Sequence, residues 1–337
     1  MAKIIIDCGT TNSRLRLAAG EEGQMTDVLK IEAGIRNTAM DGNTDRLKSY
    51  LQEGIRSLVE RNGLELSDVD YMAASGMITS NIGLFEVPHV TGPAGVKDLA
   101  AQAKMVRLEE FFQIPCLFIP GMKSISLEGT AESSSIDEYD VMRGEEVESI
   151  GLWNQQRPHG EGLMVLPGSH TKFVFVEENG TLKKSYTTLA GELLKAVQSE
   201  TILSGSLKEE LIESFISRYF DEGFTSCEKV GVTRALFHVR LLDLQGKVNA
   251  NERANYMAGV LFHEDWKALK LALSKLDRLD WVMVGGSSPL RELFVYLLQK
   301  LEQDCEIREL DEKSSDMAAF HGALEVIKAY EEEQNEN

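Results

Sequence analysis

The sequence lacks the features of a secreted or membrane-spanning protein. It has only four cysteines, Cys8, Cys116, Cys227 and Cys305, and they form no C-x-x-C pair. This spacing argues against a zinc site and a disulfide framework, and it fits a reduced cytoplasm. We recognise no signal peptide, and no apolar run approaches the length of a membrane span. We therefore expect a cytoplasmic protein without a transmembrane helix.

Positive charge is also scarce. The 337 residues include 35 Lys and Arg against 54 Asp and Glu, which gives a formal net charge of −19. An acidic surface argues against nucleic acid or an anionic membrane as a partner. It does not argue against a nucleotide, because a few local cations and N–H groups suffice to bind one. The 43% of hydrophobic residues is enough for two ordinary domains.

Several familiar catalytic patterns are missing as well. The chain contains no G-x-S-x-G, P-loop or dinucleotide-binding sequence. Apart from one histidine in the second turn described below, the histidines show no ligand spacing with acids or cysteines. We interpret these as structural or surface residues: His89, His159, His238, His263 and His321.

What the chain does contain is a short pattern that occurs twice. Residues 4–15 read IIIDCGTTNSRL, and residues 164–175 read MVLPGSHTKFVF. Each is an apolar strand, a tight turn with one glycine and several hydroxyl or amide side chains, and a second strand. Such a turn can present backbone N–H groups and hydroxyls to an anion such as phosphate. Two such turns indicate two lobes that grip one polyphosphate, and therefore a kinase or an ATPase.

The rest of the chain mixes strands and helices, so we predict an α/β fold with two related lobes. Hydrophobic periodicity predicts helices over 45–62 and 94–106. A buried strand is expected over 281–284 and a final helix over 314–330. Two surface features complete the predicted organisation, a polar excursion over 124–140 and a frayed acidic tail from residue 331.

The first turn offers an acid for a metal ion. Asp7 could organise Mg²⁺ through water, because this ion keeps several waters and takes one or two carboxylates. The alternative is an ordinary hairpin whose Asp and Thr cap their own backbone. The repeated turn around Gly168 favours the functional interpretation. There, Ser169, His170 and Thr171 could donate to phosphate and Lys172 adds a cation, although His170 fits a structural hydrogen bond equally well.

Two further segments have both a functional and a structural interpretation. Gly285 and Gly286 follow the apolar strand and could let adenosine approach the backbone, or could form a plain strand-to-helix turn. Glu145 and Glu146 open a predicted helix. A carboxylate there could accept a hydroxyl proton, but acidic charge also stabilises a helix N-terminus. Without further context the structural interpretation is preferred for the glutamates.

Together these residues resemble the superfamily of sugar kinases, actin and heat-shock chaperone ATPases. They resemble more closely the 2-dehydro-3-deoxygalactonokinases, also called 2-keto-3-deoxygalactonate kinases. One departure is Cys8, where members of the family commonly carry Trp. The segments that carry the resemblance follow in matching order: 7–12 with Arg14, 32–34, 76–77 with 80–81, 142–146, 167–170 with Lys172, and 190–193.

The resemblance implies two lobes of actin-like or ribonuclease H-like type with an ATP cleft between them. Residues 1–142 would form the N-terminal lobe, with the first phosphate turn and the sugar-acid site. Residues 143–337 would form the C-terminal lobe, with the second turn, the adenosine site and a final helix that packs back at the hinge. In that helix, Ala319 and Gly322 would allow a close helix crossing.

The implied activity is ATP-dependent phosphorylation of the 6-hydroxyl of 2-dehydro-3-deoxy-D-galactonate in galactonate catabolism, with ATP and Mg²⁺ as cofactors. The resemblance makes Glu145 the favoured base and Glu146 the runner-up. It implies phosphate contacts from Gly9, Thr10, Thr11, Asn12, Gly168, Ser169, His170, Thr171 and Lys172, metal binding by Asp7, and adenosine contacts from Gly285 and Gly286. Substrate contacts are expected from Glu32, Asn81, Arg14, Arg36 and Arg143.

Two alternatives remain open at this point. The first is a kinase of the same fold that acts on another sugar or sugar acid. The second is a nucleotide-dependent binding or regulatory protein without a small phosphoryl acceptor. The sequence leaves open whether the protein forms a homodimer.

Overall fold

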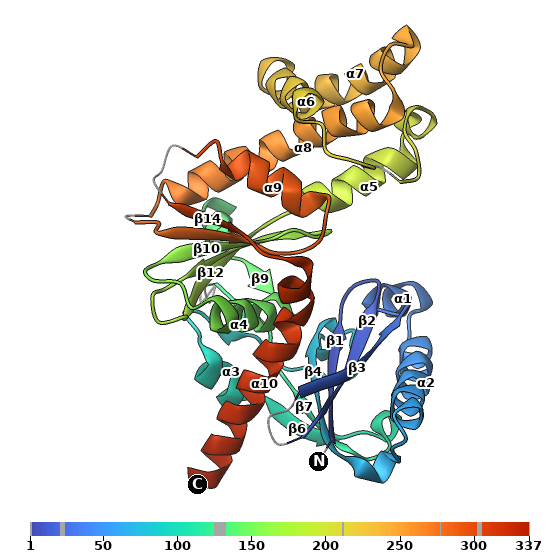
Figure 1. Ribbon diagram of the computed structural model, residues 1–337, viewed down its shortest axis with the longest axis vertical. Coiled ribbons are helices and arrows are strands. Elements are labelled where there is room, and N and C mark those ends of the chain that lie inside the picture. The colour runs from blue at the N-terminus through green and yellow to red at the C-terminus, as the bar shows by residue number, and fades with distance from the viewer. Residues whose placement is uncertain are drawn as a thin grey trace. The chain divides into compact units, whose positions relative to one another are not determined.

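The computed structural model describes residues 2–20, 24–124, 133–210, 212–276, 278–301 and 305–336. These residues form strands and helices that separate into two compact units (Figure 1). Unit 1 comprises Met1–Pro158, Val176–Ser185 and Asp316–Asn337, and unit 2 comprises His159–Phe175 and Tyr186–Ser315. This division differs from the predicted boundary between residues 142 and 143, because α4 and nearly all of α10 belong to unit 1.

The main sheet of unit 1 has the strand order β3-β2-β1-β4-β7-β6. β2 pairs antiparallel with both β1 and β3, β4 and β7 continue the sheet in parallel with β1, and β6 is antiparallel to β7. The strands are β1 (Ala2–Cys8), β2 (Ser13–Ala19), β3 (Gln24–Ile31), β4 (Val69–Gly76), β6 (Lys104–Arg107) and β7 (Pro115–Phe118).

Alternation along β1 gives the two faces of this sheet different roles. Ile4, Ile6 and Cys8 are buried in a core that includes the apolar side of α2 (Asp45–Arg61), which lies beside the sheet in Figure 1. The other face carries Asp7 and Lys3, whose Nζ lies 3.1 Å from Glu331 Oε1 of α10 (Glu312–Glu336). The face toward α2 is apolar, whereas the opposite face carries the fully buried Ile5 between the polar residues Lys3 and Asp7.

The remaining elements of unit 1 are short, apart from α4. β5, β8 and β9 form a small sheet in the order β5-β8-β9. The elements are α1 (Ile35–Asp41), η1 (Leu66–Asp68), η2 (Met77–Thr79), β5 (Val90–Thr91), α3 (Val96–Gln102), η3 (Glu109–Phe111), β8 (Met122–Lys123), η4 (Ser133–Glu138), β9 (Val141–Met142) and α4 (Glu145–Gln156).

The sheet of unit 2 has the order β12-β11-β10-β13-β14. Its strands are β10 (Gly162–Leu166), β11 (Thr171–Val176), β12 (Leu182–Thr188), β13 (Trp281–Val284) and β14 (Glu306–Glu309). Both sheets share the order third, second, first and fourth strand along the chain. In unit 2 the fifth strand follows, whereas in unit 1 the sixth strand, β7, comes before the fifth, β6. This shared order confirms the predicted α/β fold with two related lobes.

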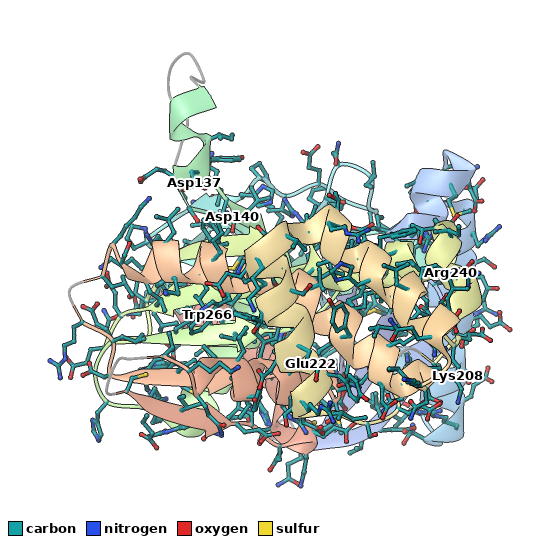
Figure 2. The ribbon with its side chains drawn as sticks, turned by 90° about the horizontal axis from the view of Figure 1, so that it is seen from above. Asp137, Asp140, Lys208, Glu222, Arg240 and Trp266 are labelled. Carbon is teal, nitrogen blue, oxygen red and sulfur yellow. The ribbon has the colours of Figure 1, made fainter. Side chains whose placement is uncertain are left out.

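Helices cover the sheet of unit 2. Phe294 of α9 contacts Phe173 of β11 and Phe262 of α8, with ring centroids 5.9 Å and 4.8 Å apart. Figure 2 shows α6, α7 and α8 side by side, marked by Glu222, Arg240 and Trp266 respectively. The elements are α5 (Ala190–Glu200), η5 (Ile202–Ser206), α6 (Ser217–Val230), α7 (Val232–Gln245), α8 (Ala250–Leu273) and α9 (Leu290–Leu298).

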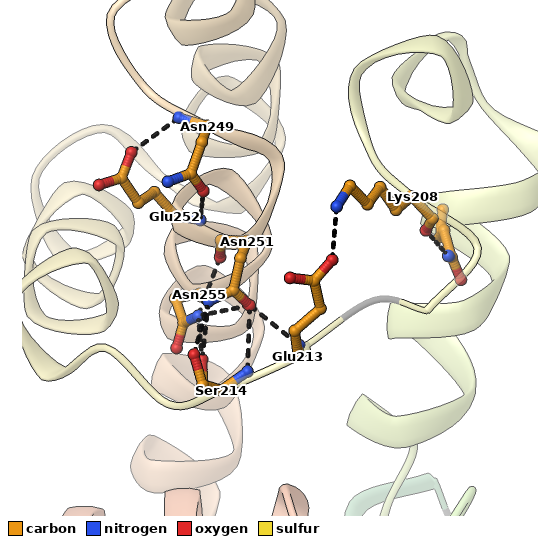
Figure 3. A network of polar contacts seen from close by, with 8 residues as sticks. Lys208, Glu213, Ser214, Asn249, Asn251, Glu252 and Asn255 are labelled. Atoms are coloured by element: carbon orange, nitrogen blue, oxygen red, sulfur yellow. Dashed lines mark hydrogen bonds and ion pairs between the residues drawn. The ribbon is translucent and has the colours of Figure 1, made fainter.

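A network of asparagines fixes the chain that enters α6 (Figure 3). Asn255 of α8 is fully buried, accepts the Ile216 N–H at 2.8 Å and donates to the Ser214 carbonyl at 2.9 Å. Asn251, one turn earlier, accepts the Glu213 N–H at 2.9 Å. A buried side-chain amide whose oxygen and NH₂ group both form hydrogen bonds favours one arrangement of the backbone. The start of α6 is therefore held against α8.

The structure confirms several predicted elements and corrects others. The strands around both turns, the helix over 45–62 and the strand over 281–284 are present. The helix predicted over 94–106 is too long, because α3 ends at Gln102 and Lys104–Arg107 form the edge strand β6, which pairs with β7. The predicted frayed tail is helical through Glu336. In the predicted excursion over 124–140, residues 125–132 lie outside the described residues and η4 follows them.

No helix within the described ranges combines the length and the apolar character needed to span a membrane.

Candidate active site

The first turn, between β1 and β2, is tightly closed and firmly supported. The Gly9 N–H donates to the Asn12 carbonyl at 2.9 Å. The Arg36 N–H, at the start of α1, donates to the Thr10 carbonyl at 2.9 Å. Gly34 lies so close that a Cβ there would be 2.6 Å from the Thr10 carbonyl oxygen. Gly9, Thr10 and Thr11 are exposed, so the turn is ordered by its own unit and open to a ligand.

Asp7 lies at the end of β1 beside two arginines of β2. Its Oδ2 is 3.8 Å from Arg14 Nη1 and 3.9 Å from Arg16 Nη1. Arg16 is 1% exposed, and its Nη2 donates to the Asp316 carbonyl of α10 at 2.7 Å. Burial lowers the pKa of Arg16, whereas the charges of Asp7 and Asp316 oppose that shift. The Asp7 carboxylate is thus held between cations while part of it remains accessible.

Close packing of glycines brings the start of α4 to the ends of β1 and β4. Gly144, immediately before α4, has a φ of +114°, and a Cβ on it would lie 3.2 Å from the Gly76 Cα. Gly76 has a φ of +83°, and its Cβ would lie 2.5 Å from the Cys8 carbonyl oxygen. Glycine adopts such positive φ angles without steric cost and leaves room for this approach. The first residues of α4 consequently lie near Asp7.

The two glutamates at the start of α4 differ in exposure. Glu145 is partly exposed, and its Oε2 accepts the Arg143 N–H at 2.9 Å. Glu146 is fully buried, and the Gly144 N–H lies 2.8 Å and 2.9 Å from its two carboxylate oxygens. Burial, followed by the charge of Glu145, raises the pKa of Glu146 to about 8. Glu145 is therefore the one that a substrate can reach, and Glu146 stabilises the backbone at the helix start.

Sequence reasoning missed Glu148, which lies three residues after Glu145 and hence on the same side of α4. Burial raises the pKa of Glu148 to about 8, and the negative charges of Glu145 and Asp7 add to the shift. Arg14 and Arg16 oppose it. The spacing of Glu145 and Glu148 on a predicted helix was the available signal. We refer to Asp7, Glu145 and Glu148 as the carboxylate cluster.

The carboxylate cluster offers oxygen atoms of the kind that bind magnesium, but among the described residues its three side chains do not all lie within 4.8 Å of one another. Carboxylate oxygens are the ligands that Mg²⁺ prefers. Burial is the main cause of the raised pKa of Glu148, and a divalent cation would relieve the added repulsion from Glu145 and Asp7. Asp7 is the residue of the carboxylate cluster that lies on a strand, β1, and its side chain is 22% exposed.

Arg143 is engaged by its own unit. Its Nη1 lies 2.6 Å from both the carbonyl and the hydroxyl oxygen of Thr79, and its Nη2 donates to the Val87 carbonyl at 3.1 Å and contacts the His89 ring. Burial lowers the pKa of Arg143. These contacts make Arg143 a brace for the segment that carries the exposed Asn81.

The other predicted substrate residues lie around the first turn. Glu32 and Arg36 are exposed and flank the buried residues Ala33 to Ile35. The carbonyl of Ala33 accepts the Ser13 hydroxyl at 2.7 Å, at the start of β2. The segment with Glu32 and Arg36 is therefore attached to the hairpin that carries Asp7.

In unit 2, the start of α5 supports the second turn. The Glu192 N–H donates to the Ser169 carbonyl at 2.8 Å, and a Cβ on Gly191 would lie 1.9 Å from the Gly168 carbonyl oxygen. The exposed His170 has its Nε2 2.8 Å from Glu192 Oε2, so it has the partner that a structural interpretation requires.

The last two residues of this predicted site are buried. Thr171 is 1% exposed and Lys172 is 6% exposed. Lys172 Nζ donates to the Thr187 hydroxyl at 2.8 Å. The exposed side chains of the second turn are those of Ser169 and His170.

The glycine pair lies beside the second turn within unit 2. The Gly285 N–H donates to the Val165 carbonyl at 2.9 Å. Gly286 has a φ of +77°, and its Cβ would lie 3.1 Å from the carbonyl oxygen of Pro167, next to Gly168. The two segments predicted to contact ATP in this part of the chain are thus neighbours.

The chain is similar to known proteins in sequence and in fold. The sequence matches the family model of 2-keto-3-deoxy-galactonokinase over residues 7–322. No match is found among curated protein sequences. Among solved structures, the fold is similar to that of a candidate 2-dehydro-3-deoxygalactonokinase from Sinorhizobium meliloti, with a TM-score of 0.73 and 23% identity over 97% of this chain and 98% of that chain.

Two other solved structures give lower scores. Component A of (R)-2-hydroxyglutaryl-CoA dehydratase from Acidaminococcus fermentans has a TM-score of 0.49 and 14% identity, covering 98% of each chain. A candidate N-acetylmannosamine kinase from Listeria monocytogenes has a TM-score of 0.44 and 12% identity over 99% of this chain and 100% of that chain. The family match spans nearly the whole sequence, so the chain belongs to the 2-keto-3-deoxy-galactonokinase family and is a carbohydrate kinase that transfers phosphate to a hydroxyl group.

Proposed function

We propose that the protein uses ATP to phosphorylate the 6-hydroxyl of 2-dehydro-3-deoxy-D-galactonate in galactonate catabolism. The family supplies the class of reaction. The observation that carries the proposal is the partly exposed Glu145 carboxylate at the start of α4, whose charge acts on Glu148 together with that of Asp7 at the end of β1. Unit 1 therefore offers both a proton acceptor and an acid suited to a metal–nucleotide complex.

In this proposal Glu145 is the general base. The transition state of phosphoryl transfer is loose, so positioning and charge neutralisation dominate the catalysis. Glu145 accepts a hydrogen bond from the acceptor hydroxyl, orients it and takes its proton late in the reaction. The Arg143 N–H, which donates to Glu145 Oε2, keeps the carboxylate in place. Glu146 has a supporting role, because its carboxylate is buried against the Gly144 N–H.

The phosphates of ATP would contact the first turn, Gly9 to Asn12, and the second turn, Gly168 to His170. Thr171 and Lys172 would shape the second turn, since their side chains are buried. Gly285 and Gly286 would contact adenosine. Asp7, assisted by Glu148, would hold Mg²⁺, which neutralises charge on the phosphate oxygens when bound.

The sugar acid would bind to unit 1 around the first turn. Its carboxylate needs a cation, and the exposed Arg36 and the partly exposed Arg14 offer one. Its hydroxyls would contact Glu32 and Asn81. Arg143 would act indirectly, by holding the segment that presents Asn81. An ATP-consuming catabolic step also supports a cytoplasmic location.

The experiment is an acceptor panel. Purified protein is incubated with ATP and Mg²⁺, and ADP release is measured with 2-dehydro-3-deoxy-D-galactonate, its gluconate epimer and neutral sugars. We expect the highest kcat/KM with the galactonate derivative. A preference for another acceptor would indicate a kinase with a different substrate. Release of ADP that no acceptor stimulates would overturn the proposal in favour of a nucleotide-dependent binding protein.

A further inference from the structure

Three side chains with metal-binding atoms meet in unit 2, away from the residues discussed above. Cys227 lies on α6, and His263 and Glu264 are consecutive residues of α8. The thiol sulfur, one imidazole nitrogen and one carboxylate oxygen all lie within 4.8 Å of one another. Cys227 is buried, whereas the side chains of His263 and Glu264 are 15% and 46% exposed. The cluster is therefore closed on one side and open to solvent on the other.

The separations approach those of a tetrahedral metal site. Glu264 Oε1 is 3.5 Å from Cys227 Sγ and 3.1 Å from His263 Nδ1. Metal–ligand distances of about 2.0–2.3 Å place neighbouring ligands of a tetrahedral zinc ion roughly 3.3–3.8 Å apart.

We propose that Cys227, His263 and Glu264 bind one divalent ion of the zinc class, with water in the fourth position. A thiolate and an imidazole select Zn²⁺, Co²⁺ or Cd²⁺ over Mg²⁺, which prefers oxygen ligands. The site is thus distinct in chemistry from the carboxylate cluster of unit 1. The sequence alone did not indicate this site, because Cys227 and His263 lie on different helices and share no short motif.

The surroundings orient one of the three ligands and require two adjustments when an ion binds. The His263 ring packs against Phe224 of α6 with centroids 4.9 Å apart, which restricts its orientation. Lys267 Nζ lies 4.0 Å from Glu264 Oε2, but its side chain is 74% exposed and can turn toward water. Burial raises the pKa of the Cys227 thiol to about 11, so an ion must displace the thiol proton, as zinc-class ions do.

The consequence of binding would be a link between α6 and α8. The asparagine network already fixes the entry to α6, and the proposed ion lies near its other end. An ion that binds the folded state and not the unfolded chain raises the free energy of unfolding. The proposed role is therefore structural and does not depend on the acceptor specificity of the kinase.

The test is a Co²⁺ titration of the untagged, metal-stripped full chain. We expect one ion per chain and a thiolate-to-cobalt charge-transfer band that Zn²⁺ abolishes. Cys227→Ser should remove the band, and His263→Gln should weaken binding at least about tenfold. Cys305→Ser, at a partly buried cysteine of the same unit, should leave both unchanged.

Two outcomes would overturn the proposal. One is the absence of a charge-transfer band in the wild-type protein. The other is a band that survives in both Cys227→Ser and His263→Gln, since the ion would then be bound elsewhere. Circular dichroism checks that each variant is folded. If Cys227→Ser does not fold, His263→Gln and the rise in wild-type Tm with Zn²⁺ decide the question, and a Tm that does not rise contradicts the proposal.

Discussion

Gly151 of α4 and Gly322 of α10 bring the backbones of these two helices into direct contact. A Cβ on Gly322 would lie 1.8 Å from the Val147 carbonyl oxygen, and one on Gly151 would lie 1.9 Å from the Ala318 carbonyl oxygen. The sequence indicated Ala319 and Gly322 for a close crossing. The structure uses Gly322 and, in place of Ala319, the buried Ala318. The crossing ties the helix that begins with Glu145 to the helix that anchors Arg16.

The first prediction concerns this crossing. Gly322→Ala should destabilise the protein by about 1–3 kcal/mol, because the added methyl group forces the helices apart. Urea unfolding measures the change. Gly205→Ala is the matched control, since a Cβ at that position meets no atom within 4 Å. Equal stability of the two variants would contradict the close packing of α4 on α10.

The second prediction separates the two glutamates of α4. Glu145→Gln should lower kcat by about 10²–10⁴-fold while ATP binding persists, because the proposed base is lost. Glu146→Gln should keep turnover near the wild-type value, since the buried Glu146 is largely protonated at neutral pH and glutamine resembles that form. Steady-state kinetics and nucleotide titration provide the measurements. The opposite ranking would make Glu146 the base.

The third prediction is a pH dependence of stability. Folding raises the pKa of Glu146 from its ordinary value of 4.5 to about 8, so the folded state binds more protons between these values. The free energy of unfolding should therefore fall as the pH rises through this window, by up to about 1.4 kcal/mol per pH unit. Glu146→Gln removes this contribution. Its stability relative to the wild type should increase from low to high pH, and parallel curves would refute the shift.

The fourth prediction concerns Arg143. Arg143→Lys should destabilise the protein by about 1–3 kcal/mol, because one ammonium group cannot replace donors to both Thr79 and Val87. The KM for the sugar acid should rise if the braced segment presents Asn81 to the substrate. Arg218→Lys, on an exposed part of α6, is the control and should change stability by less than about 0.5 kcal/mol. If Arg143→Lys loses no more stability than Arg218→Lys, the hydrogen bonds of Arg143 do not stabilise the fold.

The local sequence was sufficient to predict those elements whose structure depends on residues close together in the chain. The apolar runs beside Gly9 and Gly168 predicted strand, turn and strand, and the periodicity of 45–62 predicted α2. β6 was missed because its hydrogen bonds come from β7, which lies further along the chain.

The same distinction holds for the candidate site. The acids at 145 and 146 were visible in the sequence, but their different exposure depends on how α4 packs. The contacts of Arg143 and the environment of Glu148 depend on residues far away in sequence, including Val87 and Asp7. No short motif encodes such contacts.

The most direct test of the account follows the phosphate itself. Wild-type protein and Glu145→Gln are each incubated with ATP, Mg²⁺ and 2-dehydro-3-deoxy-D-galactonate, and the product is identified by phosphorus NMR. The account predicts one ADP for each product molecule phosphorylated on the 6-hydroxyl, formed about 10²–10⁴-fold more slowly by the variant. Absence of that product with the wild-type protein, or its formation by the variant at the wild-type rate, would contradict the account.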